Sequence, residues 1–375
     1  MKNARCAMAK KDFTELIEEK DKAAILSSGM DFSEDTRSAS FLQQDNKILL
    51  YRSFLDGVEI MSIDEALEAY PEIRKKYFGL SFSGLSKDFS SDTEGGYFIR
   101  VKKGRSVQLP IQACLFLKNK RFKQRVHNII IVEEKATVYL ITGCAASGAA
   151  SESSHLGISE FFVHKGAYLN FTMIHSWRED IKVKPISIAL VEERASFVSN
   201  YVCLKPVREI VMYPTAVLSG KGARASFNSL ILSHTGSFQD IGSRIISKAS
   251  DTNAEIVSRA VSLGGKIIAR GHLKAESKGL KAHLECRGMV ISEKGTICAV
   301  PELETGFRDV DLSHEAAIGK ISKEEIEYLC SRGMSKAQAQ SVIIRGFMNV
   351  DILGLPEPIQ REIESLEDKT LEGNL

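Results

Sequence analysis

A turn-like segment followed by a short alternating apolar run recurs between residues 96 and 312, and this repeat constrains the fold more than any other feature. In each copy a charged or small polar pair precedes a small or apolar residue, as in EEKATVYL, HKGAYLNF, EERASFVS and GKGARASF. The residues after the turns are Ala136, Ala167, Ala195, Ala223, Ala254, Leu280 and Thr296. Their spacings are 31, 28, 28, 31, 26 and 16 residues. Ile267, in SLGGKIIA, divides the interval of 26 into two steps of 13. A basic spacing of about 14 residues, often doubled, predicts short strands stacked coil upon coil.

A β-sandwich is the alternative, because its hairpins also recur at short intervals. The stretch 96–312 contains no Asn-Gly or Asp-Gly hairpin turn, which favours a solenoid. We therefore predict a mainly β chain with a β-solenoid core over residues 96–312 and a helical region on each side.

The N-terminal region, residues 1–95, is charged and is predicted to be helical. SIDEALEAYPEIRKKYFG opens with Ser62 and has Glu65 three residues later, the spacing of a capping box. SGLSKDFSSDTEGG, residues 82–96, is rich in Ser, Gly and Asp and is typical of a linker.

The C-terminal region, residues 313–375, is also predicted to be helical. Ser322 and Ser335 each begin a helical pattern with Glu or Gln three residues on, and Gly333 suits the helix stop between them. A last helix is expected after Pro358, followed by an acidic tail.

The composition excludes several classes of protein. A net charge of +2 gives no sign of a nucleic-acid or membrane surface, and no apolar run approaches the roughly 18 residues of a membrane span. MKNARCAMAKKDF lacks the apolar core of a secretory signal. The seven cysteines are odd in number and scattered, which fits free thiols in a reducing cytoplasm: Cys6, Cys114, Cys144, Cys203, Cys286, Cys298 and Cys330.

Two familiar catalytic motifs are absent or incomplete in the sequence. No G-x-x-x-x-G-K-[ST] loop is present, so the chain is not expected to hydrolyse a nucleotide itself. HEAAI at His314 starts like a zinc-protease motif, but Ile318 stands where the second His belongs.

Cys286 in HLECRGM is the thiol of greatest interest. The period of two along a strand places it on the opposite face from Glu285 and Arg287. A nearby guanidinium lowers a thiol pKa through space, and thiolates favour zinc, copper(I) and iron–sulfur clusters. Packing as a small buried apolar group is the alternative.

His314 and Glu315 follow at the exit from the repeats. If coils step by about 15 residues, Cys286 lies two coils from them, with Glu302 or Glu304 on the coil between. These residues would then line one strip of the solenoid and hold a metal. Alternatively, SHEA caps the solenoid and starts a helix.

His272, with Arg270 beside it, lies roughly one coil before Cys286 and is a candidate supporting residue. A solvent-facing strand histidine is the alternative. A β-helix enzyme acting on carbohydrate also stays open, although Trp177 is the only tryptophan and carboxylate or aromatic strips are typical of such enzymes.

The chain resembles the SufB/SufD family, the scaffold subunits of the SUF machinery for iron–sulfur cluster assembly. The stretches that carry the resemblance span nearly the whole chain in the family's order: AYPEIRKKYFG, GGYFIRVKKGRSVQLPIQA, VYLITGCAAS, SRIISKAS, ECRGMVISEKG, LSHEAAIGKISKEEIEYLCSRGMS and VIIRGF.

The resemblance implies a right-handed parallel β-helix, with residues 313–375 docking an ATPase partner of the SufC type. It implies that Cys286 matches the assembly-site cysteine of SufB, as ligand of a nascent, transient iron–sulfur cluster or as sulfur acceptor. His314 and Glu315 match positions that support cluster formation. A sulfur donor and apo-protein acceptors would be further partners of this cytoplasmic, non-enzymatic scaffold.

The chain also departs from the family pattern. Met212 stands where a lysine associated with sulfur transfer is expected, and Cys6 is the only cysteine near the N-terminus. A SufD-like, non-catalytic stabilising subunit is therefore the alternative. Because one thiolate is too few for a cluster, we expect the late coils of two chains to meet, as a homodimer or as a heterodimer with a paralogue.

Overall fold

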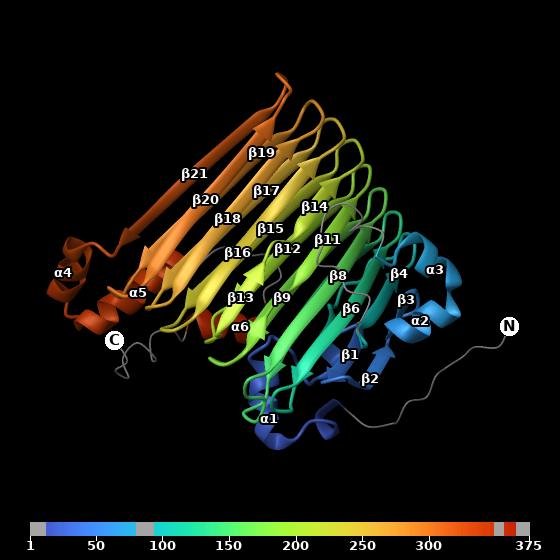
Figure 1. The fold of residues 1–375 in the computed structure, drawn as a ribbon, viewed down its shortest axis with the longest axis horizontal. Coiled ribbons are helices and arrows are strands. Elements are labelled where there is room, and N and C mark those ends of the chain that lie inside the picture. Colours follow the sequence, from blue (N-terminus) through green and yellow to red (C-terminus); the bar gives the residue numbers. More distant parts are fainter. Residues whose placement is uncertain (1–12, 80–93, 349–355, 365–375) are drawn as a thin grey trace.

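The computed structural model describes residues 13–79, 94–348 and 356–364. They form a mainly β structure in which parallel coils stack into a β-solenoid of about 8 turns, with a few helices at the ends (Figure 1). The predicted fold class is confirmed.

The strands form two sheets, and each complete coil contributes to both. Sheet A contains, in spatial order, β2 (Lys47–Ser53), β1 (Ala39–Gln44), β5 (Ile111–Leu117), β7 (Thr137–Ala146), β9 (Tyr168–Ser176), β12 (Ser196–Cys203), β15 (Arg224–Ser233), β17 (Asn253–Ser262), β19 (Lys281–Val290) and β21 (Asp311–Lys320). Sheet B contains β3 (Val58–Ser62), β4 (Tyr97–Val101), β6 (Lys123–Val132), β8 (Ser154–Val163), β11 (Ile186–Val191), β14 (Thr215–Leu218), β16 (Phe238–Ser247), β18 (Lys266–Ala275) and β20 (Thr296–Thr305), with the short β10 (Lys182–Val183) and β13 (Glu209–Met212) beside them.

Side chains that point inward from the two sheets form one apolar core along the solenoid. Four phenylalanines illustrate the stacking of coils: Phe161 lies 4.7 Å from Phe171 and 5.2 Å from Phe197, between ring centroids, and Phe197 lies 5.9 Å from Phe227. Phe161 comes from sheet B and meets the sheet A rings of Phe171 and Phe197 across the core, whereas Phe197 and Phe227 come from adjacent coils of sheet A.

The paired strands correct the predicted stacking of the repeat. Residues that face each other in adjacent coils are 27 to 31 positions apart, as for Ile188 and Thr215 or Lys123 and Ser154. The basic spacing of the sequence repeat is half a coil, because successive strands alternate between the sheets. The prediction that each such unit stacks on the next was therefore wrong.

The N-terminal region is only partly helical. Helices α1 (Glu19–Leu26), α2 (Ile63–Ala69) and α3 (Pro71–Lys76) and two 3₁₀ turns, Phe13–Glu15 and Glu34–Thr36, are present. The Ser62 cap is confirmed, since its hydroxyl accepts from Glu65 N at 3.1 Å.

Residues 39–62 hold three strands that the helical prediction missed. β1 and β2 form an antiparallel hairpin, and β1 also pairs in parallel with β5, so it joins the hairpin to sheet A. Asp45, at the hairpin turn, has a φ of 52°, which Asp tolerates better than most residues. Cys6 and most of the predicted 82–96 linker lie outside the described residues.

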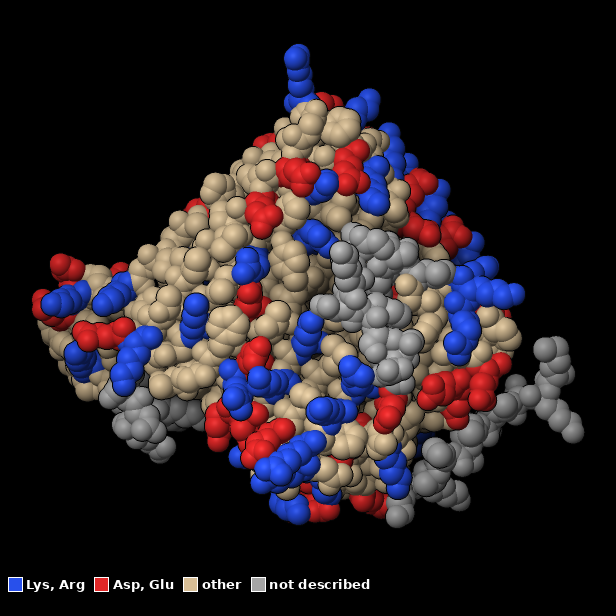
Figure 2. All heavy atoms as spheres, viewed as in Figure 1, with Lys and Arg blue, Asp and Glu red and all other residues tan. Residues whose placement is uncertain are grey.

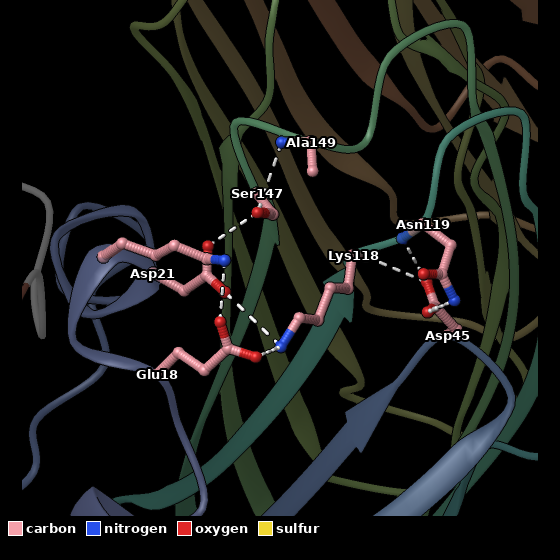
Figure 3. A network of polar contacts seen from close by, with 8 residues as sticks. Glu18, Asp21, Asp45, Lys118, Asn119, Ser147 and Ala149 are labelled. Atoms are coloured by element: carbon pink, nitrogen blue, oxygen red, sulfur yellow. Dashed lines mark hydrogen bonds and ion pairs between the residues drawn. The ribbon is translucent and has the colours of Figure 1, made fainter.

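A polar network ties the N-terminal helix to the first coils (Figure 3). Lys118 pairs with Glu18, and Ser147 Oγ donates to the buried Asp21 Oδ1 at 2.6 Å. Asp45 accepts from Lys118 N at 2.9 Å and from Asn119 Nδ2 at 2.8 Å. The helix and the hairpin are thus attached to the same edge of the solenoid.

The C-terminal region begins with a strand, which corrects the prediction of helix from residue 313. β21 continues to Lys320 because all ten of its residues pair with β19. Helices α4 (Lys323–Ser331), α5 (Lys336–Met348) and α6 (Glu357–Glu364) follow, and Ser322 caps α4 as predicted. The division of the chain into domains 1–95, 96–312 and 313–375 stays a prediction.

The last two helices fold back against the outer face of sheet A. Ile344, Met348 and Ile359 pack on a stripe of strand residues that includes Leu230 and Val261. No helix in the described ranges is long and apolar enough to cross a membrane.

Candidate functional site

Cys286 lies on β19 and points into the core of the solenoid. Its side chain is 2% exposed, and its neighbours in the adjacent strands are Ser258 and Ala316. Burial, together with the nearby charge of Glu285, raises the pKa of the Cys286 thiol to about 11. The thiol is therefore protonated at neutral pH in this arrangement, and Arg287 does not activate it.

His314 lies on the same face of sheet A as Cys286. It is the register partner of the buried Leu284, two residues along β19 from Cys286, so the two side chains are diagonal neighbours on the inner face. His314 is exposed because β21 is the last strand of sheet A in the described chain. The structure thus leaves the predicted thiol and imidazole together, at the open end of the core.

Glu315 lies on the opposite, outer face. It is the register partner of Glu285, and Arg287 Nη2 contacts its Oε1 at 3.3 Å. The prediction that Cys286 and Glu315 line one strip is wrong, because adjacent residues of a strand point to opposite sides of the sheet.

The other four candidate residues lie on sheet B. Arg270 donates to Asp240 at 2.6 and 2.9 Å. His272 lies beside Glu302 and Glu304, with nitrogen–oxygen distances of 3.9 and 3.4 Å. Glu302 and Glu304 do not lie between Cys286 and β21 as predicted, because residues 296–305 form a strand of the other sheet.

Two residues that were not predicted from the sequence lie next to Glu315. His283, Glu285 and Glu315 offer one ligand atom each, and these atoms lie within 4.8 Å of one another. His283 and Glu285 are two positions apart on β19, so they share the outer face. The period of two, combined with the true length of one coil, would have found this group.

The last coil leaves its inner face uncovered in the described chain. Leu303 and Ile318 are 38% and 43% exposed, although their register partners Leu273 and Gly288 are buried. Phe307, in the turn between β20 and β21, is 44% exposed. On the face shown in Figure 2, acidic and basic side chains are intermixed.

Met212, at the position where the resemblance led us to expect a lysine, and Cys144 are buried in the earlier coils. Met212 is 4% exposed in β13, and Cys144 is 1% exposed in β7. The pKa of the Cys144 thiol is raised well above its usual value by burial. The six described cysteines form no disulfide, and Cys298 is the exposed one among them.

Fold and site together define a β-solenoid protein with candidate sulfur and metal ligands on its last coils. The family profile described as SUF system FeS cluster assembly, SufBD core domain, matches residues 116–347. The chain belongs to the SufBD family of iron–sulfur cluster assembly proteins.

Relatives from three organisms carry the description iron-sulfur cluster assembly SufBD family protein. The Archaeoglobus fulgidus protein is 47% identical over 347 residues, which cover 92% of this chain and 93% of that protein. The Methanothermobacter thermautotrophicus protein is 39% identical over 358 residues, covering 93% and 87%. A Staphylococcus aureus protein is 31% identical over 327 residues, covering 85% and 70%.

Proposed function

We propose that this chain is a scaffold on which iron–sulfur clusters are assembled, with Cys286 as the ligand of the nascent cluster or the acceptor of sulfur. The observation that carries the proposal is the position of Cys286: a family member keeps a thiol one coil from the open end of its solenoid, beside His314. A thiol deep in the middle coils would have no comparable route to iron.

The chemistry requires the thiol to lose its proton. The raised pKa of Cys286 keeps it protonated while the end of the core stays as it is. Its activation therefore needs a change at the last coil that exposes the sulfur, and His314 on the same face is placed to take the proton or to become a second ligand.

A second chain at the open end would supply the missing ligands. The outer edges of β20 and β21 have no partner strand among the described residues, and the uncovered Leu303, Phe307 and Ile318 lie beside them. A homodimer, or a heterodimer with a paralogue, would cover this surface and present two thiols and two imidazoles.

An ATPase of the SufC type would bind the C-terminal helices and drive the rearrangement. Tyr328 of α4 is 58% exposed and is a natural contact for such a partner, because aromatic side chains are enriched where proteins bind one another. ATP binding can change the last coil only if the ATP-bound partner binds one arrangement of that coil more tightly than the other. Hydrolysis belongs to the partner in this proposal.

A SufD-like stabilising role is the second candidate, and the buried, protonated Cys286 favours it. In that case the chain would pair with a paralogue that carries the reactive thiol. Either role would be carried out in the cytoplasm, where free thiols persist.

The proposal is tested by anaerobic purification of the chain co-expressed with a SufC-type ATPase. We expect a complex that contains iron and acid-labile sulfide, both lost when Cys286 is replaced by Ala. A complex without iron or sulfide would contradict the scaffold role. Co-purification only with a second SufB-like chain would support the stabilising role instead.

A further inference from the structure

We infer that His283, Glu285 and Glu315 form a binding site for a divalent transition-metal ion, iron(II) in the cell, on the outer face of sheet A. The site is separate from Cys286, which points to the other face. Metal binding stands without the proposed function, whereas the assignment to iron rests on it.

The three side chains converge because of the strand register. His283 and Glu285 alternate with inward residues along β19, and Glu315 faces Glu285 from β21. Their ligand atoms are within 4.8 Å of one another, a separation that one ion at metal–ligand distances of about 2 Å would bridge with small side-chain shifts.

Existing contacts orient these groups and leave donor atoms open. His283 Nδ1 lies 2.9 Å from Ser313 Oγ. Arg287 contacts Oε1 of Glu285 at 3.2 Å and Oε1 of Glu315 at 3.3 Å. Each side chain thus uses one of its two polar atoms in these contacts. Each side chain therefore keeps a second polar atom for a metal, while the contact through the first orients it, as in many metal sites.

A surface groove reaches His283, one of the three residues of the cluster. It has a volume of about 500 Å³, runs over the first residues of the sheet A strands, and is lined by His283 and Ser313 among others. An ion with several bound waters can therefore approach His283 without any opening of the core.

The donor set and local charge indicate which ion binds and how tightly. One imidazole and two carboxylates suit iron(II), manganese, cobalt or zinc, whereas a thiolate set would favour softer ions. Arg259 and Arg287 offset the two carboxylates, so binding is weaker than at an unpaired acidic pair. A site of this kind holds iron as cargo and releases it.

Cobalt(II) is the probe for the test, added to the purified full chain. We expect one Co²⁺ per chain by calorimetry, with a weak visible absorption and no intense sulfur-to-cobalt band. His283→Gln and Glu315→Gln should each weaken binding at least tenfold, and Arg287→Gln should tighten it severalfold because a competing cation is removed. An excess of iron(II), added anaerobically, should displace the cobalt.

His272→Gln is the matched control, since His272 also lies beside two glutamates but each of its ring nitrogens faces a different one. It should bind Co²⁺ as wild type does, and so should Cys286→Ala. Unchanged affinity in a folded His283→Gln would overturn the site, as would loss of binding in Cys286→Ala. Failure of iron(II) to compete would overturn the assignment to iron. None of these readings depends on cluster assembly, so they separate this site from the proposed function.

Discussion

Cys286 and Glu315 lie on adjacent strands of one sheet but on its opposite faces. Cys286 faces the core beside Ala316, and Glu315 faces solvent beside Glu285. In a single chain they cannot hold the same ion without a rearrangement of β21. The geometry therefore separates the proposed sulfur position inside the solenoid from the proposed metal position outside it.

Cys286 should react slowly with alkylating reagents. A thiol with a pKa of about 11 has about 100-fold less thiolate at pH 8 than one at the usual value of 9.0, and burial slows access further. Mass spectrometry after timed iodoacetamide treatment should show Cys298 modified long before Cys286. Equal rates in the native protein would show that the last coil is already open.

The folded protein should lose stability as the pH falls from 6.5 towards 4. Burial lowers the pKa of His155 to about 4 and that of His175 well below its usual value. The unfolded chain therefore takes up protons in this range before the folded chain does, and unfolding is favoured.

For His155 alone, the free energy of unfolding should be about 2 kcal/mol lower at pH 5 than at pH 7. Urea titrations at both pH values measure the difference, and His155→Gln should reduce it. If the variant keeps the full wild-type pH dependence, His155 does not cause it.

Replacing Gly96 by Ala should destabilise the start of the solenoid strongly. Gly96 has a φ of 113°, and an added Cβ would clash with the backbone of His127. We expect a loss of about 3 kcal/mol or more in the free energy of unfolding. Gly104, with a φ of 69° and open space around it, is the control: Gly104→Ala should cost only about 1 kcal/mol. Similar costs at the two positions would contradict the close approach.

The solenoid could be predicted from the sequence because every coil repeats the same signal. Ala136, Ala167, Ala195 and Ala223 each precede a strand of sheet A and are buried, as a tight turn packed on its neighbour requires. The spacing alone did not show how many strands one coil holds. Because one strand was taken for one coil, Glu302 and Glu304 were predicted to lie between Cys286 and His314, whereas they lie on the other sheet.

The ends of the fold were harder to predict for a different reason. The SHEA segment has the pattern of a helix start, yet residues 311–320 pair fully with β19. The pairing with β19 therefore overrides the local helix propensity. The same holds for β1, whose pairing with β5 brings Ala39 beside Ile111, far along the chain. Local patterns carry no information on such partners.

The proposed dimer predicts that Ile318→Asp makes the chain monomeric. Ile318 lies on the uncovered inner face of β21, where a charge would have to be buried by the second chain. Light scattering should show at least about a tenfold weaker association. Leu109→Asp alters a residue of similar exposure, 45%, far from β21 and should change nothing. A dimer unaffected by Ile318→Asp would place the interface elsewhere.

Anaerobic reconstitution of the chain together with a SufC-type ATPase and ATP, using iron(II) and sulfide and followed by visible absorption and by iron and sulfide analysis, tests the role of Cys286 most directly. Wild type and Cys298→Ala, which removes an exposed thiol outside the core, should retain equal amounts of iron and sulfide. Cys286→Ala should retain neither above background. Equal retention in Cys286→Ala and wild type would contradict the assignment of this cysteine to cluster assembly.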